Sequence, residues 1–274
     1  MTTLAESFWV PLPALYVAVP TRPREVPLPG SSTLDIDPPI ALEPCDPLVL
    51  FNEYTRLQSG NDILAGLGSQ LPAVEMSFYL RLEADVVHAS RLYLIHPINM
   101  ALQGLTETRI TCQAEESHGP TARTDISWKY FDDEENEWRT LAILEFKNTY
   151  MLVQDDFAPG MADMRQGSPR SPRALISGAY SRRARQGFTW LREGASRLAR
   201  QALKYSGSTG TGYVAIFDWK SMFIFDFEGM DEGEYELAKG TWFEETPGGQ
   251  SYETFRMLLF GMLVKALKRN GLVN

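Results

Sequence analysis

The stretch "LAILEFKN", residues 141–148, combines an apolar run with two charged side chains. A short continuous apolar run is typical of a strand buried within a sheet. Glu145 and Lys147 lie two residues apart, so on a strand their side chains point to the same face. Charged groups are rarely buried unless they are paired or bind a metal ion. The stretch therefore predicts a buried strand that ends in two charged residues, Glu145 and Lys147, with a chemical or structural role.

A second strand is expected just before this one. The segments "RTDISWKYF" and "WRTLAILEFK" flank the acidic stretch "DDEENE", which predicts a β-hairpin over residues 123–131 and 138–147. With the turn centred near residue 134, Asp125 lies roughly opposite Leu144 or Glu145. We expect Asp125, Glu145 and Lys147 to form one cluster at the end of the hairpin away from its turn. The acidic turn lacks the spacing of a calcium loop, so we interpret it as solvated.

This cluster predicts a metal site. Two carboxylates side by side raise the pKa of one of them unless a cation lies between them. Mg²⁺ or Mn²⁺ suits such oxygen ligands, and the backbone carbonyl of Phe146 would add another. Lys147 beside the ion would act on a metal-bound water or on a pentacovalent phosphate, which together would cleave a phosphodiester. The alternative is a buried salt bridge of Lys147 with Glu145 or Asp125.

The remaining pattern predicts the domain organisation. Helices are expected over 48–67, 72–102 (ended or kinked at Pro97), 188–205 and 251–269, with a second hairpin over 213–228. This order favours one α/β domain over residues 48–274, with a central mixed β-sheet flanked by helices. Residues 1–47 are proline-rich and are expected to form an extended arm or irregular cover. Residues 113–122 and 160–174 are predicted loops, the second ordered on binding, and "SGSTGTG" is predicted to stop the helix before it.

Composition restricts the class of protein. The 274-residue chain is 44% hydrophobic, and no apolar run approaches the ~20 residues of a membrane span. Two cysteines, Cys45 and Cys112, supply neither a disulfide framework nor a thiolate zinc cluster, so we expect an intracellular location, in nucleus or cytoplasm. The formal net charge is −9, yet residues 161–204 hold ten basic and two acidic residues. An acidic protein with one basic segment can still attract a polyanion locally; a solvated loop and helix face is the alternative.

The charged hairpin resembles a known family. Asp125 in "RTDISW" and Glu145-Phe146-Lys147 in "LEFK", between two helices, resemble the PD-(D/E)XK nuclease superfamily, although Thr124 stands where that family usually has Pro. The segment "QALKY", Gln201 to Tyr205, resembles the Gln-xxx-Tyr element of its exonuclease-like branch. The similarity covers roughly residues 72–228. It implies a restriction-endonuclease-like core and hydrolysis of DNA, with RNA as the alternative, in the presence of Mg²⁺ or Mn²⁺.

The resemblance also implies roles for individual residues. Asp125, Glu145, the Phe146 carbonyl and one helix-borne acid would hold the metal; we assign that acid as Glu83, with Glu75 and Asp85 as rivals. Lys147 would act on the attacking water or the transition state, and Gln201 would order the site. The residues expected to contact substrate are mostly basic and lie on or before the helix that carries Gln201: Arg197, Arg200, Lys204, Tyr205, Arg182 and Arg183. We expect structural roles for His88 and His96.

Two other functions stay open. The chain could be a nuclease-fold protein that binds nucleic acid or a partner protein without cutting, which the net charge favours. It could also be an interaction module that recruits a protein through residues 1–47. In each case we expect no membrane partner, and we expect the apolar face of 255–267 to be core rather than a dimer seam.

Overall fold

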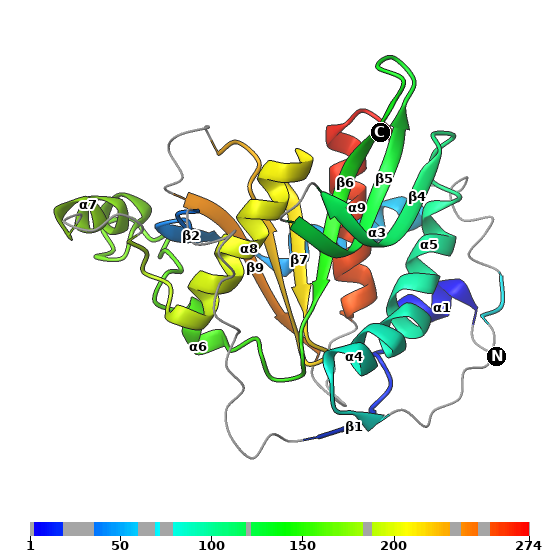
Figure 1. The fold of residues 1–274 in the computed structure, drawn as a ribbon, viewed down its shortest axis with the longest axis horizontal. Coiled ribbons are helices and arrows are strands. Elements are labelled where there is room, and N and C mark those ends of the chain that lie inside the picture. The colour runs from blue at the N-terminus through cyan, green and yellow to red at the C-terminus, as the bar shows by residue number, and fades with distance from the viewer. Residues whose placement is uncertain are drawn as a thin grey trace.

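A seven-stranded mixed sheet organises the computed structural model (Figure 1). The structure describes residues 3–18, 36–59, 69–71, 79–118, 122–182, 188–230, 237–245 and 253–273. The strand order across the sheet is β2-β9-β8-β7-β6-β5-β4. These strands span Ala41–Pro44 (β2), Ile110–His118 (β4), Ala122–Asp132 (β5), Glu137–Phe146 (β6), Tyr213–Phe217 (β7), Ser221–Asp226 (β8) and Leu237–Glu244 (β9).

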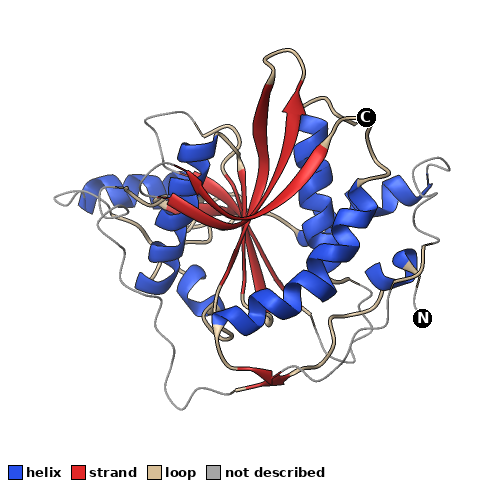
Figure 2. Cartoon of the chain, turned by 45° about the vertical axis from the view of Figure 1, so that its right-hand side comes forward, coloured by secondary structure: helices blue, strands red, loops and turns tan. Residues whose placement is uncertain are grey.

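Strand β6 lies inside the sheet, with a different type of neighbour on each side. It pairs antiparallel with β5 and parallel with β7, and the β2–β9 pair is also parallel, while the other pairs are antiparallel. The inner part of β6, from Leu141 to Phe146, is buried throughout. The strands twist strongly, with helices on both sides of the sheet (Figure 2). The predicted α/β class with a central mixed sheet and flanking helices is confirmed.

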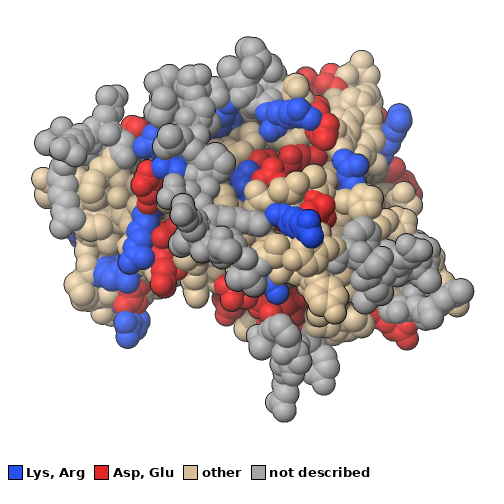
Figure 3. Space-filling view, turned by 60° about the horizontal axis from the view of Figure 1, so that its bottom comes forward, with Lys and Arg blue, Asp and Glu red and all other residues tan. Residues whose placement is uncertain are grey.

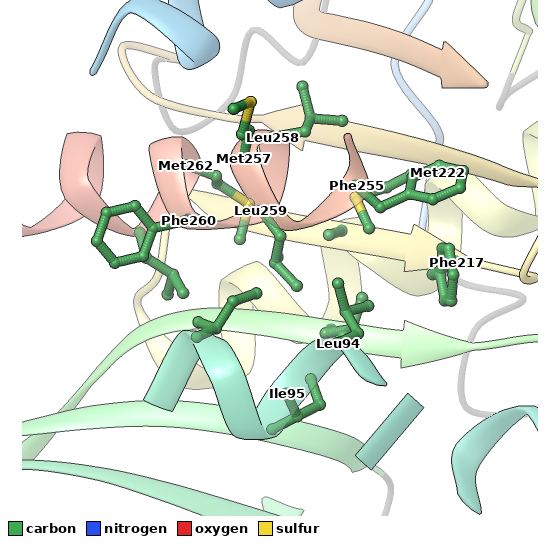
Figure 4. Close-up of a cluster of buried hydrophobic side chains, with 14 of the residues drawn as sticks. Leu94, Ile95, Phe217, Met222, Phe255, Met257, Leu258, Leu259, Phe260 and Met262 are labelled. Atoms are coloured by element: carbon green, nitrogen blue, oxygen red, sulfur yellow. The ribbon is translucent and has the colours of Figure 1, made fainter. Parts of the chain in front are cut away.

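Helix α9 (Phe255–Arg269) fills the larger core on one face of the sheet. Its side chains lie between β7, β8 and the helical segment containing Leu94 (Figure 4). Helix α3 (Pro47–Ser59) packs closely on α9 at Gly261. A side chain at that position would clash with the Leu50 carbonyl of α3. The apolar residues of 255–267 are buried as core, as expected. The same core receives α1 (Leu4–Phe8), α4 (Glu83–Ser90), the π-helical turn η1 (Arg91–Ile95) and α5 (His96–Leu102).

Helix α8 (Glu193–Thr209) covers the opposite face. Its apolar residues pack on Ile143 of β6 and Val214 of β7, and the short helix α6 (Gln154–Phe157) completes this second core. Helix α7 (Pro172–Arg182) lies beyond the β2 edge of the sheet (Figure 1). No helix in the described part of the chain is both long and apolar enough to cross a bilayer.

Both predicted hairpins are confirmed, as β5–β6 and β7–β8. Three local predictions were wrong. The loop predicted over 113–122 contains the last part of β4, a polar edge strand whose composition hid it. Helix α8 continues through "SGST" to Thr209 and is capped by Gly210, which adopts a left-handed φ of 73°. The loop predicted over 160–174 ends where α7 begins, at Pro172.

The long helix expected over 72–102 is also corrected. Helix α4 starts at Glu83, after the short strand β3 (Tyr79–Leu80), and residues 72–78 lie outside the described ranges. Pro97 neither ends nor breaks the helical path. The wider turn of η1 lets the His96 N–H bond to the Arg91 carbonyl, and Pro97, which has no N–H, follows directly at the start of α5.

The described residues of the first 47 belong to the domain rather than to a separate arm. Leu4 and Phe8 are fully buried against the α9 core, and β2 is the edge strand beside β9. Strand β1 (Tyr16–Val17) pairs in parallel with β3. Buried Arg256 donates hydrogen bonds to the carbonyls of Ser7 and Val10, which fixes this segment although its prolines prevent longer regular elements.

Candidate active site

The inner end of β6 carries the charged pair that the sequence singled out. Glu145 and Lys147 lie on the face of the sheet covered by α8, while Leu144 and Phe146 enter the α9 core. The Lys147 Nζ donates to Glu145 Oε1 at 2.6 Å, and both side chains are under 10% exposed. The other oxygen of Glu145, Oε2, is buried without a hydrogen-bond partner among the described residues. The Lys147 ammonium group and the unpartnered Oε2 of Glu145 therefore lie close together where little water reaches them.

A bulge in β6 determines which residue faces this pair. Near the hairpin turn Lys129 pairs with Thr140, but Trp128 pairs with Ala142, so Leu141 is the extra residue. Without that shift Asp125 would lie opposite Leu144 and on the wrong face. With it, Ile126 pairs with Leu144, and the same register extended by one residue brings Asp125 to Glu145. The Thr211 hydroxyl donates to the Leu141 carbonyl at 2.7 Å, which satisfies the bulged backbone.

Asp125 lies beside this pair and is held by the backbone of β6. Its Oδ2 accepts the Phe146 N–H at 2.8 Å. Burial raises the pKa of Asp125, against the opposing effects of that hydrogen bond and of the Lys147 charge. Since a strand residue directs its N–H and C=O to the same side, the Phe146 carbonyl faces Asp125 too. The predicted cluster of Asp125, Glu145 and Lys147 is thus present in space.

Helix α8 completes the surroundings of Glu145. The Gln201 amide Nε2 donates to Glu145 Oε1 at 2.7 Å and to the Tyr205 hydroxyl at 2.6 Å. Tyr205 in turn hydrogen-bonds to Glu145. Burial raises the pKa of Glu145 to about 7; Lys147 lowers it and Asp125 raises it further. Burial also raises the pKa of Tyr205, so its hydroxyl stays protonated and can donate. Tyr205, a predicted substrate residue, contacts the Glu145 carboxylate in the structure.

Glu83, at the first turn of α4, joins the cluster from the other side. Its carboxylate accepts the Asn148 N–H, and burial raises its pKa, with a further rise from Asp125 and a lowering by Lys147. The rival Asp85 instead accepts the N–H groups of Arg81 and Leu82 and caps α4. Glu75 lies outside the described residues. His88 and His96 are both exposed.

The donor set fits a hard divalent ion. Among the described residues, no group of three or more His, Cys, Asp or Glu side chains is arranged so that it could hold a metal ion. Mg²⁺, however, is commonly bound through one or two carboxylates together with water and substrate phosphate. Asp125 and the open Oε2 of Glu145 supply those carboxylate oxygens, and the Phe146 carbonyl and Glu83 stand beside them. All these donors are oxygens, which Mg²⁺ and Mn²⁺ prefer.

Of the predicted substrate residues on α8, Arg197 and Lys204 lie within about 60° of Gln201 around the helix axis, whereas Arg200 lies about 100° away. Arg197 is one turn before Gln201 and forms an ion pair with Glu193. Arg200 and Lys204 are partly buried, and burial lowers the pKa of Lys204. Arg182 is the last residue of α7 with its side chain outside the described part, as is all of Arg183. On the face seen in Figure 3, basic and acidic side chains are interspersed.

Three features of the site could not be predicted from the sequence. Leu141 is one of six consecutive buried residues, so no alternation of polar and apolar residues marks the bulge. Asn148 contributes only a backbone N–H, which any residue except proline could supply. Asp218 in the β7–β8 turn is a third: it accepts the Leu152 N–H at 2.9 Å and so fixes the chain after Lys147, and only the "FDW" turn signal pointed to it.

Comparison with protein-family models, with curated proteins and with solved structures finds no match for this chain.

Proposed function

We propose that this protein is a metal-dependent nuclease of the PD-(D/E)XK type that hydrolyses phosphodiester bonds in DNA, with RNA as the alternative substrate. The observation that carries the proposal is the meeting of Asp125, Glu145 and Lys147 on one face of the hairpin, with an open carboxylate oxygen. The order of Asp, Glu-x-Lys and the Gln-xxx-Tyr helix supports the same family.

The chain's own groups would divide the work. Asp125, Glu145, the Phe146 carbonyl and Glu83 would hold Mg²⁺ or Mn²⁺, which when bound supplies charge stabilisation and a more acidic water. Gln201 and Tyr205 keep the Glu145 carboxylate in one orientation by donating hydrogen bonds to it. Burial raises the pKa of Glu145 to about 7, so this carboxyl group would lose its proton near neutral pH and could then hold the ion.

Lys147 would act on the reacting phosphate. Its Nζ is held at 2.6 Å from Glu145, next to the proposed ligands. Attack by water on phosphorus forms one P–O bond and breaks another, and the added negative charge on the phosphoryl oxygens is what an ammonium group stabilises. Arg197, Arg200 and Lys204 would contact flanking phosphates, giving affinity that depends on salt and not on sequence.

The test is cleavage of plasmid DNA, single-stranded DNA and RNA in Mg²⁺, Mn²⁺ or EDTA. We expect the wild-type protein to cut in either metal and not in EDTA, and Lys147→Ala to lose activity by at least about 10²-fold, as when a preorganised electrostatic group is removed. Arg139→Ala is the matched control, because Arg139 is an exposed cation of the same strand. It should cut like the wild type.

A second function is favoured by one observation: Lys147 and Glu145 already form an ion pair in nearly dry surroundings. A protein of this fold that binds nucleic acid or a protein partner without cutting would show that pair and intact substrate under every metal condition. That outcome, with binding retained, would replace the nuclease proposal. We keep an intracellular location as part of the proposal, since Cys45 and Cys112 are both free thiols.

A further inference from the structure

Two tyrosines are paired on a small ribbon whose second strand, β3, comes just before the helix that begins at Glu83. Strands β1 and β3 pair in parallel, with Tyr16 opposite Tyr79 and Val17 opposite Leu80. Leu80 is fully buried in the α9 core, whereas Tyr16 is 78% exposed and Tyr79 48% exposed. Because side chains alternate along a strand, both rings lie on the solvent face of the ribbon.

This ribbon is rigidly connected to Glu83. The Asp85 carboxylate accepts the N–H groups of Arg81 at 2.8 Å and of Leu82 at 2.9 Å, which fixes the turn between β3 and α4. Tyr79 is four residues from Glu83, so their Cα atoms are at most about 14 Å apart. In Figure 1 the ribbon lies directly below the start of α4.

A positive charge accompanies the rings. The Arg81 guanidinium lies over the Tyr79 ring, 4.7 Å from its centroid. Exposed aromatic faces with an adjoining cation match the two parts of a nucleotide, a flat base and a phosphate. Bases in a duplex are stacked on each other, and only an unpaired strand offers a free face.

We propose that Tyr16, Tyr79 and Arg81 form a base-stacking subsite for single-stranded nucleic acid that enters the active site beside Glu83. The inference rests on the proposed nuclease function and names its substrate class. The two rings take successive bases, Arg81 faces the phosphate between them, and the strand continues toward Asp125 and Glu145. Stacking does not distinguish deoxyribose from ribose, so oligothymidylate and oligouridylate serve as separate arms of the test.

The experiment measures binding in EDTA, where no cleavage occurs. Fluorescence anisotropy gives Kd for labelled oligothymidylate, oligouridylate, an abasic strand of equal length and a duplex. Tyr16→Ala and Tyr79→Ala should each weaken binding to the single strands with bases by about tenfold, the effect of one lost base stack. Binding to the abasic strand should stay unchanged, and Tyr79→Trp should bind at least as tightly as wild type. Tyr180→Ala, on α7 and similarly exposed at 45%, is the matched control.

The possible results separate the two proposals. Equal weakening on the abasic and base-bearing strands, or no weakening on either, overturns the stacking subsite. A wild-type protein that prefers base-bearing single strands, and loses this preference in Tyr79→Ala, supports it. If that same protein cuts nothing in Mg²⁺ or Mn²⁺, the nuclease proposal fails while the subsite stands.

Discussion

The two ends of the β5–β6 hairpin carry the same types of charged residue in very different surroundings. At the outer end, Asp132 of β5 pairs with Glu137 of β6, and Arg139 follows two residues later. The Arg139 Nε lies 3.0 Å from Asp132 and 3.3 Å from Glu137. Arg139 is 44% exposed and Glu137 60% exposed, so water screens these charges.

The inner end repeats this arrangement in a buried setting, with Asp125 on β5, Glu145 near the end of β6 and Lys147 just after that strand. Helix α8 covers it, Gln201 and Tyr205 contact Glu145, and Glu83 approaches from α4. One acidic residue on a strand, facing an acidic and a basic residue two positions apart on its neighbour, therefore does not by itself make an active site. Chemistry becomes available where packing removes water, raises the pKa of a carboxylate and leaves one of its oxygens open.

The largest difference between the two ends should appear when each glutamate is neutralised. Glu145→Gln keeps the shape but removes the ligand charge, and we expect metal-dependent cleavage to fall by at least about 10²-fold. Glu137→Gln removes a solvated charge and should leave the cleavage rate within about twofold. Initial rates in Mg²⁺ and Mn²⁺ measure both. Equal effects of the two substitutions would show that burial does not distinguish the ends.

The pH dependence of metal binding sharpens the comparison. The pKa of Glu145 rises from its ordinary value of 4.5 to about 7 on burial, so the folded protein keeps a proton there that the unfolded chain has lost. This group's contribution to the free energy of unfolding therefore falls as pH rises between those two values. An ion must displace the proton, so metal affinity should increase as pH rises through about 7.

Thermal melts with and without Mn²⁺ test this. The increase in Tm that the metal causes should be larger at about pH 8 than at about pH 6. Glu145→Gln should abolish that difference, while Glu137→Gln should keep it. A metal-induced shift that is equal at both pH values would contradict the role assigned to Glu145.

A smaller effect is expected from the residue that orients the inner glutamate. Gln201→Ala removes one donor to Glu145 and one to Tyr205, and partners of metal ligands typically contribute 10- to 100-fold, so we expect a loss of about tenfold or somewhat more. Losing a donor to the charged form should also move the pH midpoint of cleavage upward. Gln154→Ala, on the exposed start of α6, is the control. A lower rate with an unmoved midpoint would indicate a purely structural role for Gln201.

The same contrast explains how much the sequence could predict. Composition and turn signals located both hairpins, and Gln201 and Tyr205 were recognisable four residues apart on one helix face. Burial of the inner pair and exposure of the outer one depend on α8, whose packing is a tertiary effect. The Leu141 bulge and the polar strand β4 left no alternation to read. The hairpin was thus predictable from local patterns, but the face on which Asp125 lies was not.

The smallest expected effect concerns stability at the outer end. Arg139→Ala breaks contacts to Asp132 and Glu137 in which Arg139 itself is 44% exposed, so the free energy of unfolding should fall by less than about 1 kcal/mol, and by less still in high salt. Lys147→Ala leaves Glu145 buried without its cation, and protonation near pH 7 offsets only part of the cost. Urea unfolding at low and high salt compares the two. Arg139→Ala and Lys147→Ala could instead lower the free energy of unfolding equally. That result would contradict the comparison, because exposure to water would then not explain the difference between the two ends of the hairpin.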